Sequence, residues 1–199
     1  SRPDLQQVDE AVKILKTAKK PLIISGGGVR YSGAVEALVK FSEDRMIPVV
    51  ETIAGKGAFV HDHPFYVGAI GIEGTDAAKE LAENADVIIA VGTRLQDFTT
   101  GSWTTFRYDA KFININTARF DAKKHFSNPI VGDALECLNE LNSSMEDWVC
   151  DASRMDEARK LYSDWNEAID KGQAPTNASF PSYAQVIAVV NKHAKPEDT

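Results

Sequence analysis

Apolar residues recur at helical spacing near the start of the chain and then gather into short continuous runs. Within residues 4–18, Leu5, Val8, Val12 and Leu15 fall on one face of a helix. The apolar runs that follow are rich in Val and Ile, which is typical of buried strands. The pattern predicts strands over residues 22–25, 47–51, 86–91, 111–116 and 129–131, and further helices over residues 32–44, after Thr75, and over residues 134–141.

Alternating strands and helices are typical of a parallel sheet covered on both faces. We therefore expect residues 1–150 to form a three-layer α/β/α, Rossmann-like domain, with residues 52–74, which hold five glycines, as an irregular segment. Each predicted strand ends in glycine or a small polar residue, so a ligand would bind at the carboxyl edge of the sheet. Residues 151–199 are more polar and are predicted to form a helical exit segment that leads to another domain.

Composition narrows the classes of function. The 199 residues carry a net charge of −7, and no Lys/Arg cluster exceeds a pair, which argues against nucleic-acid binding. No apolar run approaches the length of a membrane span, and no signal-peptide pattern opens the sequence. Two cysteines, Cys137 and Cys150, offer no metal framework and favour a reducing, cytoplasmic compartment.

The three glycines at positions 26–28 are the most prominent local motif. They follow a predicted strand and precede a predicted helix, where a backbone without Cβ atoms allows a diphosphate to approach closely. As a dinucleotide fingerprint the motif is incomplete, because Tyr31 occupies the third glycine position, although Glu51 stands where a ribose-binding acid is expected. The alternative is a tight turn between strand and helix. Gly26, Gly27 and Gly28 are therefore candidate cofactor-binding residues.

A second candidate loop follows the predicted strand at residues 86–91. Arg94 is placed to pair with a phosphate, and Asp97 with a ribose or adenine edge. Thr93, which precedes Arg94 in the same loop, is also a candidate cofactor-binding residue. The alternative is a surface pair between Arg94 and Asp97. His61 and His63 lack a third ligand, so we interpret them as a solvated turn rather than a metal site. No Ser, Cys or His lies in a recognisable nucleophile motif, and no catalytic residue is predicted.

Six pieces in order resemble the central domain of thiamine-diphosphate-dependent enzymes: PLIISGGG at 21–28, PVVET at 48–52, GKG at 55–57, the glycine loop 68–74, ADVIIAVGTR at 85–94 and GDA at 132–134. The match covers about residues 4–150. Within this superfamily, ETIAGKG at 51–57, LQDFTTGSW at 95–103 and SYAQVI at 182–187 look most like the trihydroxycyclohexanedione hydrolases, which open a ring by C–C hydrolysis in myo-inositol degradation.

The resemblance implies a non-catalytic middle domain of a longer enzyme. Thiamine diphosphate and Mg²⁺ would be held by the pyrimidine-binding and diphosphate-binding domains, which are absent here, and the whole enzyme would be a homodimer or homotetramer. The isolated chain is expected to be inactive.

The alternative is a central domain that binds FAD or ADP, as in acetolactate synthase-like or glyoxylate carboligase-like enzymes. The family's Asp-Ile-Asp strand, which approaches the adenosine, reads Asn114-Ile115-Asn116 here. Asn116 joins the candidate cofactor-binding residues, while the loss of both carboxylates argues against flavin. An NAD-dependent deacetylase of similar sheet architecture would commonly carry four zinc-binding cysteines, and the chain has two.

Overall fold

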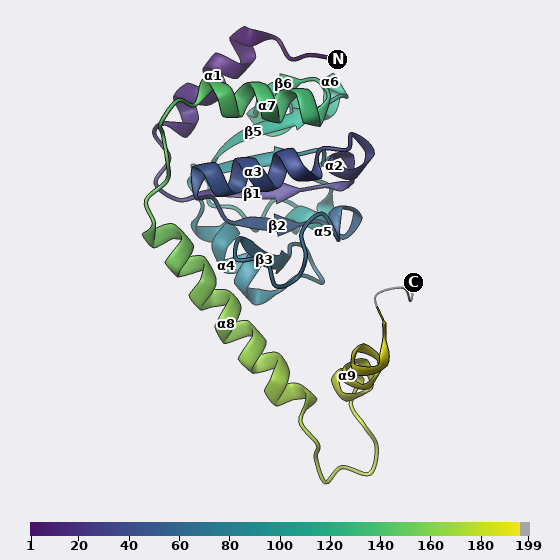
Figure 1. The fold of residues 1–199 in the computed structure, drawn as a ribbon. Helices are drawn as coiled ribbons and strands as arrows, with labels where there is room; N and C mark the ends of the chain where they lie inside the picture. The colour runs from purple at the N-terminus through teal and green to yellow at the C-terminus, as the bar shows by residue number, and fades with distance from the viewer. Residues whose placement is uncertain (196–199) are drawn as a thin grey trace. The chain divides into compact units, whose positions relative to one another are not determined.

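A six-stranded parallel sheet forms the centre of the computed structural model, which describes residues 1–195. Its strand order is β3-β2-β1-β4-β5-β6 (Figure 1). Neighbouring β1 and β4 are separated in sequence by two strands, so the order of the strands reverses between them. The strands are β1 (Pro21–Ser25), β2 (Val49–Glu51), β3 (Tyr66–Ala69), β4 (Val87–Val91), β5 (Lys111–Asn116) and β6 (Asn128–Val131).

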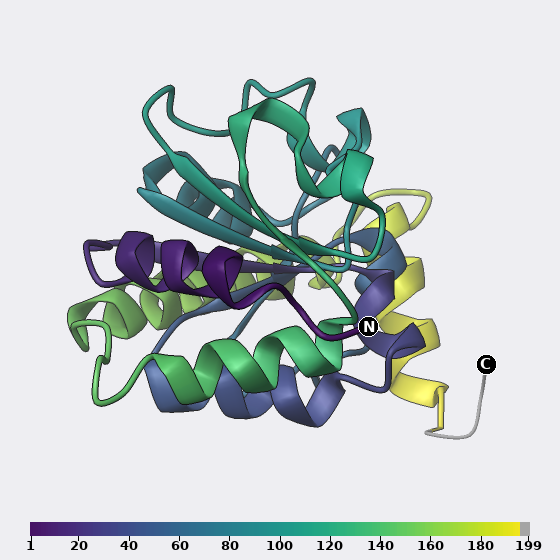
Figure 2. The same ribbon diagram turned by 90° about the horizontal axis from the view of Figure 1, so that it is seen from above.

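Helices cover both faces of this sheet, which confirms the predicted three-layer class. Figure 2 shows α3 and α7 side by side on one face, and α1 contacts α7 there. The crossovers through α4, α5 and α6 run in the opposite direction along the sheet, which brings them to the other face. The helices of this part are α1 (Leu5–Leu15), α2 (Gly27–Tyr31), α3 (Val35–Arg45), α4 (Asp76–Asn84), α5 (Asp97–Thr100), α6 (Arg119–Ala122) and α7 (Ala134–Ser144), with 3-10 turns η1 (Ile53–Gly55) and η2 (Lys124–Phe126).

The core follows from the register of the central strands. Ile23, Ile89 and Ile113 are paired across β1, β4 and β5 and are fully buried beneath the layer of α1, α3 and α7. Their sequence neighbours point to the other face because side chains alternate along a strand. Both faces of β1 and β4 are therefore mainly apolar, as the continuous Val and Ile runs predict.

One prediction is wrong within residues 52–74. Tyr66–Ala69 forms the edge strand β3, and the Val49 amide donates to the Phe65 carbonyl oxygen at 2.8 Å. Gly68 has φ of +98°, and a Cβ there would lie 2.6 Å from the Thr75 side chain. The glycine that makes this short strand look irregular in sequence is the residue that lets the chain pass the start of α4.

Two buried arginines join elements that are far apart in sequence. The Arg45 guanidinium at the end of α3 donates to the carbonyl oxygens of Asn142, Glu146 and Trp148 at 2.7–2.9 Å and to the Asn142 side chain. Beside it, hydrogen bonds from Lys40 and Asn142 lower the pKa of Asp44. Arg154 binds the carbonyl oxygens of residues in β1 and α4. The hydrogen bonds from Arg45 thus satisfy carbonyl oxygens at and just after the end of α7, where no further turn of the helix supplies N–H donors.

The chain divides into two compact units. The first spans Ser1–Tyr162, and the second starts at Ser163, within the long helix α8 (Ser153–Gln173). Met155 and Ala158 of α8 are buried, so the first unit continues past residue 150. The second unit contains α9 (Tyr183–His193), whose Ser182 and Gln185 form a reciprocal cap and which has no buried residue. None of the helices within residues 1–195 is both long and apolar enough to cross a membrane.

Candidate functional site

The loops after β1 and β4 pack directly against each other at the carboxyl edge of the sheet. The Gly26 amide donates to the Val91 carbonyl oxygen at 2.8 Å, and the Gly28 amide donates to the Gly92 carbonyl oxygen at 2.9 Å. A Cβ on Gly26 would lie 2.4 Å from the Gly92 carbonyl oxygen. The glycines are required because two backbone segments meet here.

This packing changes the chemistry expected of the glycine motif. A diphosphate cradle needs free backbone N–H groups, and those of Gly26 and Gly28 already have carbonyl partners. Gly27 faces the loop after β2, because a Cβ there would lie 2.9 Å from the Ala54 carbonyl oxygen. The geometry matches the alternative that the sequence left open, a tight turn from strand to helix.

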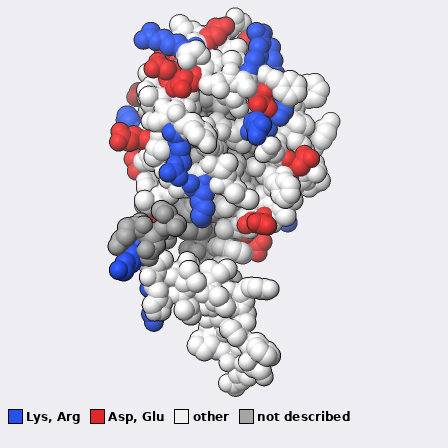
Figure 3. Space-filling model, turned by 90° about the vertical axis from the view of Figure 1, so that its right-hand side faces the viewer, with Lys and Arg blue, Asp and Glu red and all other residues white. Residues whose placement is uncertain are grey.

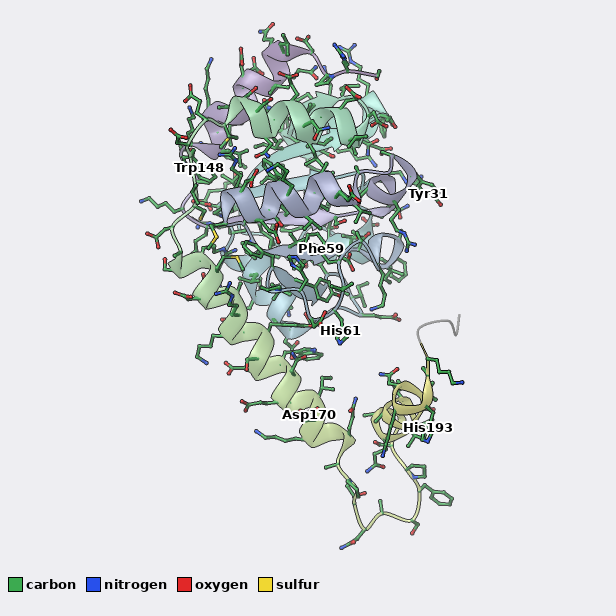
Figure 4. The ribbon with its side chains drawn as sticks, viewed as in Figure 1. Tyr31, Phe59, His61, Trp148, Asp170 and His193 are labelled. Carbon is green, nitrogen blue, oxygen red and sulfur yellow. The ribbon has the colours of Figure 1, made fainter. Side chains whose placement is uncertain are left out.

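A hollow of about 390 Å³ opens beside the loops after β1 and β4, at the carboxyl ends of β4, β5 and β6. The Arg94 side chain is exposed at its wall and forms no ion pair within the described part of the chain. Tyr31 projects outward at the same edge and is 95% exposed (Figure 4). The hollow is lined by Gly28, Tyr31, Ser32, Gly92, Arg94, Ile115, Asn116, Thr117, Ala118, Asp121, Gly132, Asp133 and Ala134.

Asn116 reaches the hollow but is occupied by the backbone. Its amide nitrogen donates to the Thr93 carbonyl oxygen at 3.0 Å, and its side-chain oxygen accepts from the Ala118 amide at 2.9 Å. Asn114 is fully buried, and its amide nitrogen donates to the Asp121 carbonyl oxygen at 2.9 Å. Both asparagines thus hold the loops around β5 together.

Thr93 and Asp97 do not line the hollow. The Thr93 hydroxyl oxygen accepts from the Leu95 amide at 3.2 Å, and Thr93 itself is buried. Asp97 is exposed at the start of the short helix α5 and does not line the hollow. The structure therefore brings together Gly28, Arg94 and Asn116 around one hollow, without Asp97.

Glu51 does not occupy a ribose-binding position. It is 1% exposed, and its carboxylate accepts the backbone N–H groups of Gly57 at 3.1 Å and Phe59 at 2.8 Å. Phe59 lies inside the unit beside β2 (Figure 4). The acid that looks like part of a fingerprint in sequence organises the loop after β2 instead.

Comparison with known proteins decides the family. Residues 8–141 match the family described as "Thiamine pyrophosphate enzyme, central domain". The chain belongs to this family.

Individual relatives share one printed description, 3D-(3,5/4)-trihydroxycyclohexane-1,2-dione hydrolase. The protein from Clostridium perfringens (strain ATCC 13124) is 42% identical over 167 residues, 83% of this chain and 26% of the relative. The protein from Clostridium botulinum (strain Alaska E43) is 40% identical over 190 residues, 94% of this chain and 29% of the relative. The protein from Bacillus subtilis (strain 168) is 41% identical over 165 residues. The chain spans about a quarter of the length of these relatives.

The thiols of this central domain are not poised to react. Burial, together with the carboxylates of Asp133 and Glu136, raises the pKa of Cys137 to about 12. Burial also raises the pKa of Cys150 to about 11. Both thiols stay protonated near neutral pH and pack as small apolar groups.

His61 and His63 lie in different environments. His61 is exposed (Figure 4), as predicted for a solvated turn. The prediction is wrong for His63, whose ring lies 4.9 Å from Phe59 and whose Nε2 lies 3.3 Å from the Glu43 carboxylate. Within residues 1–195 no three His, Cys, Asp or Glu side chains gather in positions that could hold a metal ion.

Several lining residues were missed in the sequence. Ser32 follows the glycine motif, Thr117 follows β5, and Asp133 follows β6, where its carboxylate caps α7 by accepting from the Leu135 amide at 3.0 Å. Their positions just after predicted strands could have indicated Thr117 and Asp133, because the carboxyl ends of parallel strands meet at one edge of the sheet. In Figure 3, which faces this edge of the sheet unit, acidic and basic side chains are interspersed.

Proposed function

We propose that this chain is the non-catalytic central domain of a longer thiamine-diphosphate-dependent hydrolase that opens the trihydroxycyclohexanedione ring in myo-inositol degradation. The observation that carries the proposal is the 40–42% identity with three such hydrolases over 82–94% of the chain. Thiamine diphosphate and Mg²⁺ would be bound by the pyrimidine-binding and diphosphate-binding domains of the longer chain. The exit segment after residue 150 would lead to the latter.

The domain's own part in that enzyme is to orient its neighbours. Three features support this role: the sheet, the packed loops after β1 and β4, and the hydrogen bonds of Arg45 and Arg154 to backbone carbonyl oxygens. All three use backbone polar groups to build a rigid unit. We propose a homodimer or homotetramer in the cytoplasm as the working form, as the resemblance to thiamine-diphosphate-dependent enzymes implies.

A chimaera tests this assignment. Residues of the Bacillus subtilis hydrolase that match this chain are replaced by it, and ring opening is measured with thiamine diphosphate and Mg²⁺. We expect a rate within roughly tenfold of the unmodified hydrolase, which is about 1.4 kcal/mol in activation free energy. A chimaera that folds and binds thiamine diphosphate yet leaves the ring intact would overturn the assignment.

Nucleotide binding at the hollow is the second candidate, favoured by the exposed cation of Arg94, which has no ion-pair partner among residues 1–195. Under the scaffold proposal the unfolding midpoint of the chain does not change with FAD, ADP, NAD or thiamine diphosphate plus Mg²⁺. A ligand at ~100 times its dissociation constant would add about 2.7 kcal/mol, a shift of several degrees. If FAD or ADP gives such a shift and Arg94→Ala abolishes it, the hollow is a nucleotide site.

A further inference from the structure

An exposed phenylalanine stands at the end of the turn between α6 and β6. The Phe126 side chain is fully exposed, and its φ is +57°; the preceding His125 has φ of +52°. Two successive non-glycine residues in the left-handed region are unfavourable, and the neighbourhood must hold them there.

The neighbours of Phe126 are indeed fixed. The His125 ring stacks on the Trp103 ring with centroids 3.4 Å apart and planes 29° apart. On the other side, the Ser127 hydroxyl donates to the Ala122 carbonyl oxygen at 2.6 Å. Phe126 is therefore presented to solvent by a preorganised turn, and little ordering of its backbone is needed on binding.

Two hollows flank this ring, and Phe126 lines both. One, of about 540 Å³, has mixed walls, in which Ile14, Tyr108 and Phe112 are the large apolar members. The other, of about 500 Å³, is more polar and includes Glu10 and Lys123. A protruding aromatic ring thus lies beside a recess that suits an aromatic ring.

Strand addition is closed off at this edge of the sheet. The outward-facing positions of β6 are Pro129, which has no N–H, and Val131, whose N–H donates to the Gln7 side-chain oxygen at 2.9 Å. An incoming strand would find no free donor there. Any partner at this face must bind through side chains.

Charges of both signs line the more polar hollow beside the ring, where Glu10 accepts a long hydrogen bond from the Gln6 side chain at 3.5 Å. The carboxylate of Glu10 and the ammonium group of Lys123 line the same hollow, yet neither has an ion-pair partner within the described residues. A protruding ring, a hollow and charges of both signs thus lie on one face of the molecule. A two-fold interface brings the same patch of two copies together, so the patch must be complementary to itself, as this one is.

We propose that this surface, the Phe126 face (Glu10, Tyr108, Phe112, Lys123 and Phe126), is an interface between two copies of this chain. The Phe126 ring of each copy packs against Tyr108 and Phe112 in the 540 Å³ hollow of the other, and Lys123 of each copy faces Glu10 of the other. The proposed function leaves open which surface joins the copies, and this inference names that surface; it does not rest on the reaction of the longer enzyme.

Sedimentation equilibrium of the chain over a wide concentration range tests the aromatic contact. Phe126→Asn should weaken self-association roughly tenfold or more, because a ring in a pocket is typical of an interface hot spot. Asn tolerates a positive φ, so the turn is preserved. Phe180→Asn is the matched control, because Phe180 is 83% exposed in the second unit; its association constant should equal that of the unmodified chain.

Charge reversal across copies gives the sharper test. Lys123→Glu alone and Glu10→Lys alone each place like charges opposite each other and should weaken association. An equimolar mixture of the two variants should associate as the unmodified chain does, because each mixed pair restores both attractions.

A monomer at all concentrations, a mixture no stronger than its components, or loss of association on Phe180→Asn but not on Phe126→Asn would each overturn the proposal. Matching circular dichroism spectra and unfolding midpoints of the variants show that folding is not the cause.

Discussion

Arg154 and Glu157 show how single residues attach a helix to the sheet. Arg154 is 1% exposed and donates to the Pro21 carbonyl oxygen at 3.2 Å and the Leu81 carbonyl oxygen at 3.1 Å. Glu157 accepts from Arg154 and from Lys20, both at 2.8 Å. Burial acts to raise the pKa of Glu157, but these two hydrogen bonds outweigh it and the net effect lowers the pKa.

Glu157→Gln tests this arrangement through its pH dependence. A carboxyl group whose pKa is lowered by folding stabilises the fold fully above its unfolded pKa and loses that effect as pH falls through the folded value. We expect the variant to unfold with about 1–2 kcal/mol less free energy near pH 7. The difference should shrink below about pH 4.5, the ordinary value for Glu.

Urea unfolding between pH 3 and pH 7 measures this difference. Glu167→Gln, an exposed position later in the same helix, is the control and should show almost none. A difference that stays constant down to pH 3 would contradict the role given to the ionised carboxylate.

At the level of elements, the contact between the loops after β1 and β4 holds the centre of the sheet. Both loops start at neighbouring strands, and the two strands are paired from Pro21 and Val87 to Ser25 and Val91. The glycine motif reads in sequence as a ligand loop, yet its closest partner is another loop of the same chain. Local residue propensities do not predict that these two loops come into contact, because the loops are more than sixty residues apart in sequence.

Gly26→Ala should therefore disrupt folding rather than ligand binding. The new Cβ would lie 2.4 Å from the Gly92 carbonyl oxygen and 2.6 Å from the Thr93 Cβ. We expect a loss of about 3 kcal/mol or more in the free energy of unfolding. Gly172→Ala is the matched control, since no atom of another segment lies within 4 Å of its added Cβ. Because Gly172 belongs to the second unit, the free energy of unfolding of the first unit should stay almost unchanged.

Denaturant titration of both variants makes the comparison. Equal stability of Gly26→Ala and the unmodified chain would show that the two loops separate easily, and the glycines would then be available to a ligand.

The whole molecule consists of a sheet unit and a second unit with little core of its own. Five large apolar residues of α9 are 48–92% exposed, and none of its residues is buried. A helix of eleven residues is marginal in water without packing. The stability of the chain thus resides in the first unit.

Ending the chain at Gln173 should leave the first unit intact. We expect its unfolding midpoint to change by no more than about 2 °C, because no core contact of the sheet unit is removed. Ending the chain at residue 152 also deletes Arg154, Met155 and Ala158, and should lower the midpoint severely. Thermal unfolding followed by near-ultraviolet circular dichroism measures both, and a large loss on truncation at Gln173 would contradict the division into units.

The sequence by itself determined the class of fold, the family and most of the strands and helices. Continuous Val and Ile runs bounded by glycine specify buried parallel strands, and Thr75 marks the start of α4 through its cap. These are local signals, carried by a few consecutive residues. The sequence did not predict the short strand β3, because its glycine and its position at the edge of the sheet remove the continuous apolar run that marks the other strands.

Only the tertiary structure decided what the conspicuous polar and glycine residues do. The amides of Gly26 and Gly28, the carboxylate of Glu51 and the side chain of Asn116 all bind the chain's own backbone. The same residue types in the same order would serve a ligand if those partners lay elsewhere. The reason is that a hydrogen-bonding group has a fixed capacity, and whether the fold uses that capacity depends on contacts between segments far apart in sequence.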